Sequence, residues 1–217
     1  MDHVWRTYHV GDEQVVALRD ATVCIRPGEL VAVVGPSGSG KSTFLQLIGL
    51  LDTPSQGAVR FDGREVGALA DAERTRVRLE SLGFVFQRFH LLQHLSALEN
   101  VMLPMEAAGV TLEARYARAA ELLESVGLGE RLQFRPSQLS GGQRQRVAVA
   151  RAVANSPSVI LADEPTGELH TEDKARVLDL FQTLNRQGRT VVIVTHDPDV
   201  AAVAARRDEI RDGMLRG

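Results

Sequence analysis

The chain has 217 residues, of which 44% are hydrophobic and 24% are charged. That length and balance predict one α/β domain with a sizeable core and room for a small subdomain. The formal net charge of -3 gives no electrostatic basis for binding nucleic acid, so no nucleic-acid partner is expected. The N-terminus lacks an apolar run of signal-peptide length, and no uninterrupted apolar stretch approaches roughly 18 residues. We therefore expect a soluble chain without a membrane span of its own.

The N-terminal part of the chain is predicted to be β structure. Residues 4–8 and 15–25 have the composition of strands, and a turn at residues 26–28 closes the second. Cys24, the only cysteine, excludes an internal disulfide and fits a reducing compartment. Because it lies within a strand-like run, we expect it to be a small buried hydrophobic side chain.

Residues 31–43, VAVVGPSGSGKST, indicate a buried strand, a glycine-rich loop and the start of a helix. Gly35, Gly40, Lys41 and Ser42 occupy the fixed positions of the phosphate-binding loop G-x-x-x-x-G-K-[ST]. Glycines let backbone N–H groups approach phosphate oxygens, Lys41 adds a charge for the outer phosphates, and Ser42 offers a hydroxyl to Mg²⁺. The helix that begins there points its positive end at the same anion. The stretch therefore predicts a nucleotide site.

Tyr8 lies shortly before this loop in the chain. Its ring is suited to stacking on a nucleotide base, and equally to packing on its own sheet. Both interpretations stay open at this stage.

The segments after the loop predict a helix, a hairpin, a second helix and a strand. The first helix covers residues 41–51 and stops at Asp52-Thr53-Pro54. Residues 58–61 with Asp62-Gly63 predict a hairpin that joins the N-terminal strands in a small antiparallel sheet. Residues 71–80 are expected to form a charged, largely solvated helix. The strand at 83–86 ends in Gln87, whose amide oxygen can reach Mg²⁺ or an attacking water.

From residue 89 to 155 the pattern becomes helical, and we interpret this block as an inserted subdomain. Ser96 and Glu99 have capping-box spacing, and a further helix is expected over residues 111–126. Near the start of this helical block are four apolar residues: Phe89, Leu91, Leu92 and Leu95. They are equally consistent with a docking groove and with a loop tucked onto the core.

The sequence Leu-Ser-Gly-Gly-Gln at residues 139–143 begins a long helix. Ser140 and Gln143 again have capping-box spacing. Gly141 and Gly142 leave the first N–H groups of the helix unobstructed. A second anion site is therefore predicted in the same chain.

Two further strands end in polar side chains. Residues 158–162 lead into Asp163 and Glu164, and residues 190–195 lead into His196. Because parallel sheets bind ligands beyond the carboxyl ends of their strands, we expect these side chains beside the Lys41 loop. Asp163 is placed to hold hydrated Mg²⁺, and Glu164 to orient or deprotonate water. A helix is expected over residues 171–187, and Asp212-Gly213 predicts a closing hairpin.

Taken together, these motifs resemble the ATP-binding-cassette ATPases over nearly the whole chain. The matching segments are GPSGSGKST at 35–43, VFQ at 85–87, LSGGQRQRVAVARA at 139–152, LADEPTG at 161–167, and His196. Residues 82–104, LGFVFQRFHLLQHLSALENVMLP, resemble the branch that serves macrolide-export, lipoprotein-releasing and cell-division-type permeases. The resemblance implies a P-loop NTPase (RecA-like) core with a small antiparallel β subdomain and an inserted α-helical subdomain. The core would comprise residues 1–86 and 156–217, and the helical subdomain residues 87–155.

The resemblance also implies a head-to-tail homodimer with two ATP molecules and Mg²⁺ at its interface. Glu164 would be the general base, His196 the γ-phosphate sensor, and Gln87 the link between Mg²⁺ and the permease groove. Asp163, Ser42 and Gln87 would face the metal ion. The implied nucleotide contacts are Tyr8, Gly35, Pro36, Ser37, Gly38, Ser39, Gly40, Lys41, Ser42, Thr43 and Gln87 of one copy, with Ser140, Gly142 and Gln143 of the other.

The implied function is an ATP-hydrolysing subunit that powers a membrane permease, by export or mechanotransmission, from the cytoplasmic face of the membrane. The alternative is a cell-division-type regulatory ATPase that transmits force without a transported substrate. A soluble repair or translation ATPase and a simple kinase are disfavoured, because the chain has one cassette, no long coiled-coil insertion, and LSGGQ.

One position departs from the family pattern. His170 stands where the loop after the DEPT segment usually ends in Asp. The resemblance implies that this Asp helps couple the two sites of the dimer, and a neutral His cannot supply the same fixed acceptor charge.

Overall fold

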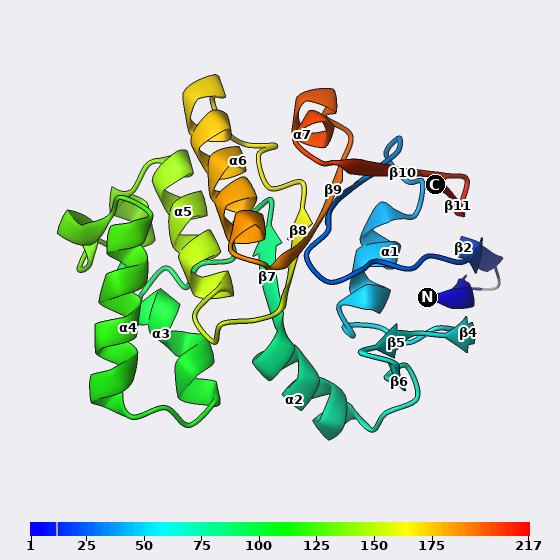
Figure 1. Ribbon diagram of the computed structural model, residues 1–217, viewed down its shortest axis with the longest axis horizontal. Coiled ribbons are helices and arrows are strands. Elements are labelled where there is room, and N and C mark those ends of the chain that lie inside the picture. Colours follow the sequence, from blue (N-terminus) through cyan, green and yellow to red (C-terminus); the bar gives the residue numbers. More distant parts are fainter. Residues whose placement is uncertain (12) are drawn as a thin grey trace.

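A six-stranded sheet forms the centre of the protein, and the computed structural model describes residues 1–11 and 13–217 (Figure 1). The strand order is β11-β10-β3-β9-β8-β7. All neighbouring strands pair in parallel except β11, which pairs antiparallel with β10 at one edge. The strands are β3 (Leu30–Val34), β7 (Leu82–Phe86), β8 (Val159–Asp163), β9 (Thr190–Thr195), β10 (Arg206–Arg211) and β11 (Met214–Arg216).

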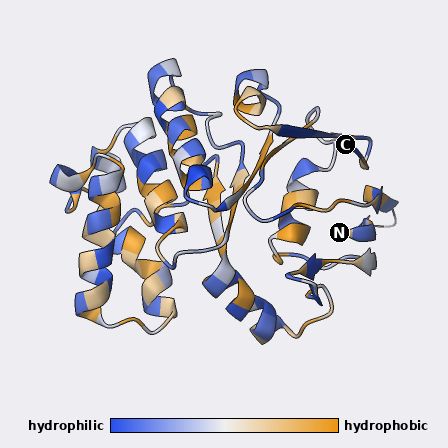
Figure 2. Cartoon of the chain, viewed as in Figure 1, coloured by the Kyte–Doolittle hydropathy of each residue, from blue (hydrophilic) through white to orange (hydrophobic). Residues whose placement is uncertain are grey.

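Helices cover both faces of this sheet, which explains why its strands are continuous apolar runs. Every residue of β9 is buried, as expected for a strand covered on both sides. Figure 2 shows hydrophobic central strands and helices whose outer sides are hydrophilic. The predicted α/β fold is confirmed. The helices are α1 (Lys41–Ile48), α2 (Asp71–Ser81), α3 (Ala97–Ala107), α4 (Leu112–Ser125), α5 (Gly141–Ala152), α6 (Thr171–Arg186) and α7 (Pro198–Ala202), with short 3-10 turns η1 (Gly129–Arg131) and η2 (Pro136–Gln138).

Alternate side chains of the strands belong to two separate apolar clusters. Ala162 and Ile193 pack with buried residues of α3, α4, α5 and α6. Leu161 and Val194 point the other way and pack with buried residues of α1. The period of two along each strand therefore builds one core on each face.

A small antiparallel sheet lies beside the core near the N-terminus. It has the order β2-β1-β4, from β1 (Asp2–Val10), β2 (Glu13–Ala21) and β4 (Gln56–Ala58). The predicted hairpin forms between β5 (Arg60–Phe61) and β6 (Arg64–Glu65), and Asp62 and Gly63 have φ of 49° and 77°. The prediction that residues 58–61 join the N-terminal sheet holds only for Ala58, which pairs with β1 as the last residue of β4, whereas the hairpin forms a separate two-stranded sheet. Val59, whose carbonyl accepts the N–H of Val66, interrupts the strand instead.

Helices α3, α4 and α5 lie together on one side of the molecule (Figure 1). Both predicted capping boxes are present, at Ser96 with Glu99 and at Ser140 with Gln143. Of the apolar residues before α3, Phe89 and Leu91 are buried in the core, whereas Leu92 is exposed. For Phe89 and Leu91 the structure therefore favours a loop tucked onto the core.

Cys24 is exposed, so its predicted burial is wrong. Strand β2 ends at Ala21, but the outward and inward alternation continues beyond it, with Val23 buried and Ile25 partly buried. Cys24 falls on the outward positions of that alternation. Its carbonyl oxygen accepts a hydrogen bond from Arg206.

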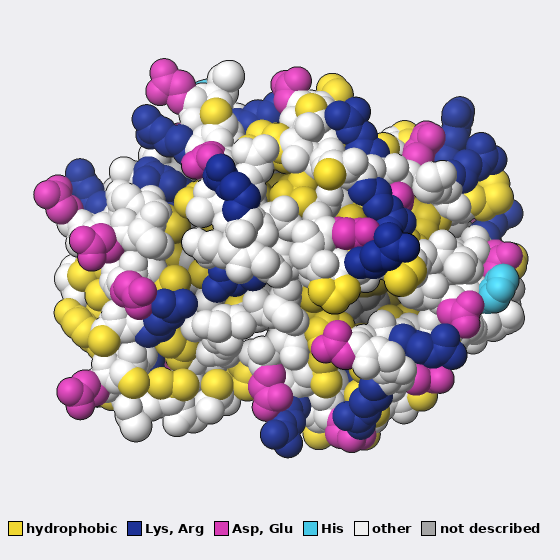
Figure 3. Space-filling view, viewed as in Figure 1, with side chains coloured by type: hydrophobic (Ala, Val, Ile, Leu, Met, Phe, Trp, Pro, Cys, Tyr) yellow, Lys and Arg dark blue, Asp and Glu magenta, His cyan; other side chains and the backbone are white. Residues whose placement is uncertain are grey.

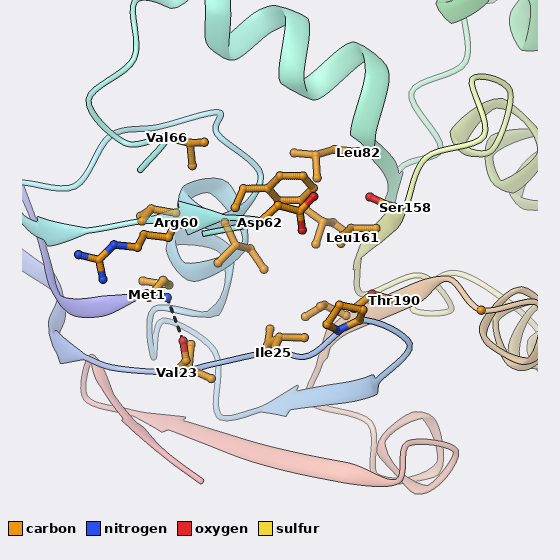
Figure 4. A pocket seen from close by; sticks show the side chains of 17 residues that line it. Met1, Val23, Ile25, Arg60, Asp62, Val66, Leu82, Ser158, Leu161 and Thr190 are labelled. Carbon is orange, nitrogen blue, oxygen red and sulfur yellow. Dashed lines mark hydrogen bonds between the residues drawn. The ribbon is translucent and has the colours of Figure 1, made fainter. Parts of the chain in front are cut away.

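An apolar cavity lies between the β subdomain and the core sheet (Figure 4). Val23, Ile25 and Leu161 are among its lining residues, and the Met1 ammonium group at its edge donates a hydrogen bond to the Val23 carbonyl. None of the predicted site residues lines this cavity.

The surface carries both signs of charge. In Figure 3, Lys and Arg side chains are interspersed with Asp and Glu side chains over the face shown. Among the helices of residues 1–11 and 13–217, none is both long enough and apolar enough to cross a bilayer.

Candidate functional site

The phosphate-binding loop connects β3 to α1 and is shaped by its glycines. A Cβ at Gly35 would overlap the carbonyl oxygen of Ile210, and one at Gly40 would overlap that of Ala17. Gly40 also has φ of 108°, a conformation that side chains rarely adopt. Both positions therefore require glycine for steric reasons within this chain.

Lys41 begins helix α1 at the open end of this loop. Its ammonium group donates hydrogen bonds to the carbonyl oxygens of Gly35 and Pro36, at 2.8 and 2.9 Å. The residue is only 8% exposed. Its positive charge is thus fixed inside the curve of the loop, where a phosphate group would be drawn to it.

Asp163 is the last residue of β8 and faces the loop. Burial and the neighbouring charge of Glu164 raise the pKa of Asp163, while a hydrogen bond with Ser42 and the charge of Lys41 lower it, with a net increase. A cation held between Asp163 and Ser42 would relieve this unfavourable burial of charge. The donor set of one carboxylate and one hydroxyl suits Mg²⁺.

Glu164 follows immediately and is held by residues at the end of β9. Its carboxylate accepts hydrogen bonds from the Thr195 hydroxyl at 2.9 Å and from the His196 backbone N–H at 3.0 Å. The Nδ1 atom of His196 lies 2.7 Å from the same carboxylate. Glu164 also has φ of 43°, an uncommon value outside glycine. Two adjacent strands therefore bring the predicted base and histidine into direct contact.

Gln87 follows β7, the next strand along the sheet from β8. Its side-chain nitrogen lies 2.9 Å from where a Cβ of Gly167 would be, so it packs on the loop after Glu164. The carboxyl ends of β3, β7, β8 and β9 thus all contribute a predicted site residue at one edge of the sheet.

The residues at the start of α5 form a separate site. Ser140 accepts a hydrogen bond from the backbone N–H of Gln143, and the Gln143 side chain accepts one from the Ser140 N–H. Gly142 lies against Asp173, whose carboxylate would overlap any Cβ there. Ser140 and Gln143 line one surface pocket, and Lys41 and Ser42 line another that shares no residue with it. One copy of the chain does not bring the two predicted anion sites together.

Comparison with known proteins identifies the family. A family model described as "ABC transporter" matches residues 18–167. The chain is 50% identical over 214 residues to an uncharacterized ABC transporter ATP-binding protein of Thermotoga maritima, covering 99% of this chain and 92% of that protein. The chain belongs to the ABC transporter family. It is an ABC ATPase domain.

In other relatives, the segment that matches this ABC domain is part of a longer protein. The macrolide export ATP-binding/permease protein MacB of Bordetella avium is 50% identical over 212 residues, which are 98% of this chain and 32% of that protein. Among solved structures, the dimeric ATP-binding cassette MJ0796 in a post-hydrolysis state with ADP and Pi has a TM-score of 0.92 at 44% identity. That match covers 99% of this chain and 94% of MJ0796.

Tyr8 does not line the pocket beside the phosphate-binding loop of this ABC domain; Val15 and Val16 of β2 do. The Tyr8 hydroxyl donates a hydrogen bond to Asp52 at 2.8 Å, and the Arg6 guanidinium lies 4.5 Å above its ring. Its side chain is therefore engaged with Arg6 of β1 and with Asp52, in the segment that follows α1. Base stacking by Tyr8 stays a prediction.

Three residues near the ABC site were not predicted from the sequence. Thr195 positions the Glu164 carboxylate. Lys174, on α6, forms ion pairs with Asp197 and Asp199, next to His196, at 2.6 and 3.0 Å. Gln145 is fully buried beneath the site. The sequence offered one signal, since Gln145 is a polar residue within the otherwise apolar buried side of α5.

Proposed function

We propose that this domain hydrolyses ATP at two composite sites of a homodimer and thereby powers a membrane permease. The observation that carries the proposal is the separation of the phosphate-binding loop and the Ser140 helix tip into two surface pockets. A second copy, turned head to tail, closes its helix tip over the triphosphate that the first copy holds. The dimeric form of MJ0796 supports this assembly.

Within each site the residues would divide the work. Residues 35–43 bind the phosphates, and Ser42, Asp163 and Gln87 would face Mg²⁺. Mg²⁺ would screen the phosphate charge and orient the γ-phosphate. Glu164 would accept a proton from the attacking water, and His196, held against Glu164, would contact the γ-phosphate.

A groove beside β7 supports a permease partner. It is lined by Leu79, Phe84, Phe86 and Arg151, and Phe86 directly precedes Gln87. An apolar groove of this kind suits a helix from another protein. The permease domain fused to the cassette in MacB relatives points to such a partner, which would hold this chain at the cytoplasmic face of the membrane. A cell-division-type module that moves no substrate fits the same groove.

Hydrolysis by the purified chain tests the central part of this proposal. We expect Mg²⁺-dependent release of phosphate from ATP, and a fall in kcat of about 100-fold or more for Glu164→Gln, because the amide cannot accept the proton. Glu121→Gln, an exposed carboxylate paired with Arg118 on α4, is the matched control and should match the wild type. Equal rates for Glu164→Gln and the wild type would contradict the assignment of the base.

The permease part needs a separate measurement. When the chain is purified from membranes with a bound membrane-spanning protein, its hydrolysis rate should differ from that of the chain alone. An unchanged rate would argue against coupling.

A further inference from the structure

Gln145 lies on α5, five residues after Ser140, and its side chain is fully buried. One other side-chain amide in the described chain, that of Asn100, is buried to the same degree. Asn100 bonds to backbone groups four to eight residues away, such as those of Leu92 and Ser96. It thus serves its own loop, whereas Gln145 reaches segments that are distant in the sequence.

The Gln145 amide connects the ends of two strands. Its Nε2 atom donates a hydrogen bond to the carbonyl oxygen of Pro165 at 2.6 Å and lies 3.4 Å from that of Phe86. Pro165 directly follows Glu164, and Phe86 directly precedes Gln87. Because both acceptors are carbonyl oxygens, the nitrogen of the amide must be the atom that faces them.

Nothing else about the position calls for a glutamine. The Oε1 atom of Gln145 has no hydrogen-bond partner among the described residues. An apolar side chain of similar length would fill the same space, but would leave the carbonyl groups of Pro165 and Phe86 without this donor. The amide is therefore explained by the two backbone groups it joins.

We propose that Gln145 is a positioning residue that fixes the distance between Glu164 and Gln87 and ties both to α5. This inference rests on the proposed function, because it concerns the geometry of ATP hydrolysis. The hydrogen bonds of the Gln145 side chain go to the backbone of Phe86 and Pro165, neither of which is a predicted phosphate contact or metal ligand. Since Ser140 caps the same helix, a shift of α5 onto the nucleotide of the other copy is passed through Gln145 to the backbone on both sides of this chain's own site.

The test is Gln145→Met, which keeps the length of the side chain and removes the donor. We expect kcat for ATP to fall about 10- to 100-fold, as for other small displacements of catalytic groups, while KM and the Kd for nucleotide stay within about twofold. Gln187→Met, the same change at the exposed end of α6, is the control and should leave all three values unchanged. A folded Gln145→Met with wild-type kcat, or with nucleotide affinity lost in proportion to kcat, would overturn the proposal.

Gln145→Glu provides a second test if the methionine variant does not fold. A carboxyl group can donate to these carbonyl oxygens only when it is protonated. The ratio of its kcat to that of the wild type at the same pH should therefore rise as the pH falls. Taking the ratio removes any pH dependence that both proteins share. A ratio near 1 at every pH would overturn the proposal.

The two hypotheses fail in different ways. If the wild-type chain does not hydrolyse Mg-ATP, the proposed function fails. If the wild type is active and both Gln145 variants equal it, only the positioning role fails.

Discussion

At the scale of single residues, the ionised form of Asp163 is unfavourable in the folded domain. Burial and the adjacent Glu164 raise its pKa. As the pH rises from the ordinary value of a carboxyl group through this raised value, the unfolded chain releases its proton before the folded chain does. The stability contributed by protonated Asp163 is therefore complete at low pH and lost as the pH rises through the raised pKa.

We therefore predict that Asp163→Asn raises the melting temperature of the nucleotide-free domain at pH 7, with a gain in unfolding free energy of about 1 kcal/mol. The gain should shrink toward pH 4, where the wild-type carboxyl group is protonated for more of the time. Thermal unfolding at both pH values measures this, and an Mg²⁺-dependent ATPase assay should show loss of activity. A variant less stable than the wild type at pH 7 would contradict this account of the charge.

At the scale of elements, the start of α5 has both a structural and a proposed binding role. Ser140 and Ser96 cap α5 and α3 with the same capping box. Ser96 is buried within its own chain, whereas Ser140 is exposed at the mouth of a pocket. Comparing these two caps therefore distinguishes an effect on helix stability from an effect on binding at the start of the helix.

Ser140→Ala and Ser96→Ala are each predicted to lower the unfolding free energy by about 1 kcal/mol, because each removes one cap. Only Ser140→Ala should also lower the rate of ATP hydrolysis, since only that tip is proposed to meet the nucleotide of a second copy. Denaturant unfolding and steady-state ATPase assays check the two halves of this prediction. Equal losses of activity in both variants would show that Ser140 acts only as a cap.

The elements also show which features the sequence can predict. Motifs with a local cause, such as the Gly40 turn, the Ser140 cap and the Asp62-Gly63 turn, lie where they were expected. The predicted burial of Cys24 was wrong because the residue lies at an outward position of an extended segment, and the register of that segment depends on distant strands. Lys174 was missed for a similar reason, since its partners Asp197 and Asp199 are close only in the folded chain.

At the scale of the whole molecule, the two predicted anion sites of one chain lie in separate pockets. Asp163, Glu164, His196 and Gln87 all lie at or directly after the carboxyl ends of strands of the central sheet. Buried strands that each end in a polar side chain were enough to predict that these residues lie at one end of the sheet. The pairing of that edge with the Ser140 tip of another copy did not follow from strand order. It came from the family resemblance, and the separate pockets are consistent with it.

Light scattering on Glu164→Gln with and without ATP tests most directly the claim that two copies of the chain pair around ATP. Because the variant is expected to bind ATP without hydrolysing it, the account predicts a monomer without nucleotide and a doubled mass with ATP. Adding Lys41→Ala, which weakens triphosphate binding, or Ser140→Arg, which blocks the helix tip, should abolish the doubling. A Glu164→Gln protein that holds ATP and remains monomeric at every concentration would contradict the account.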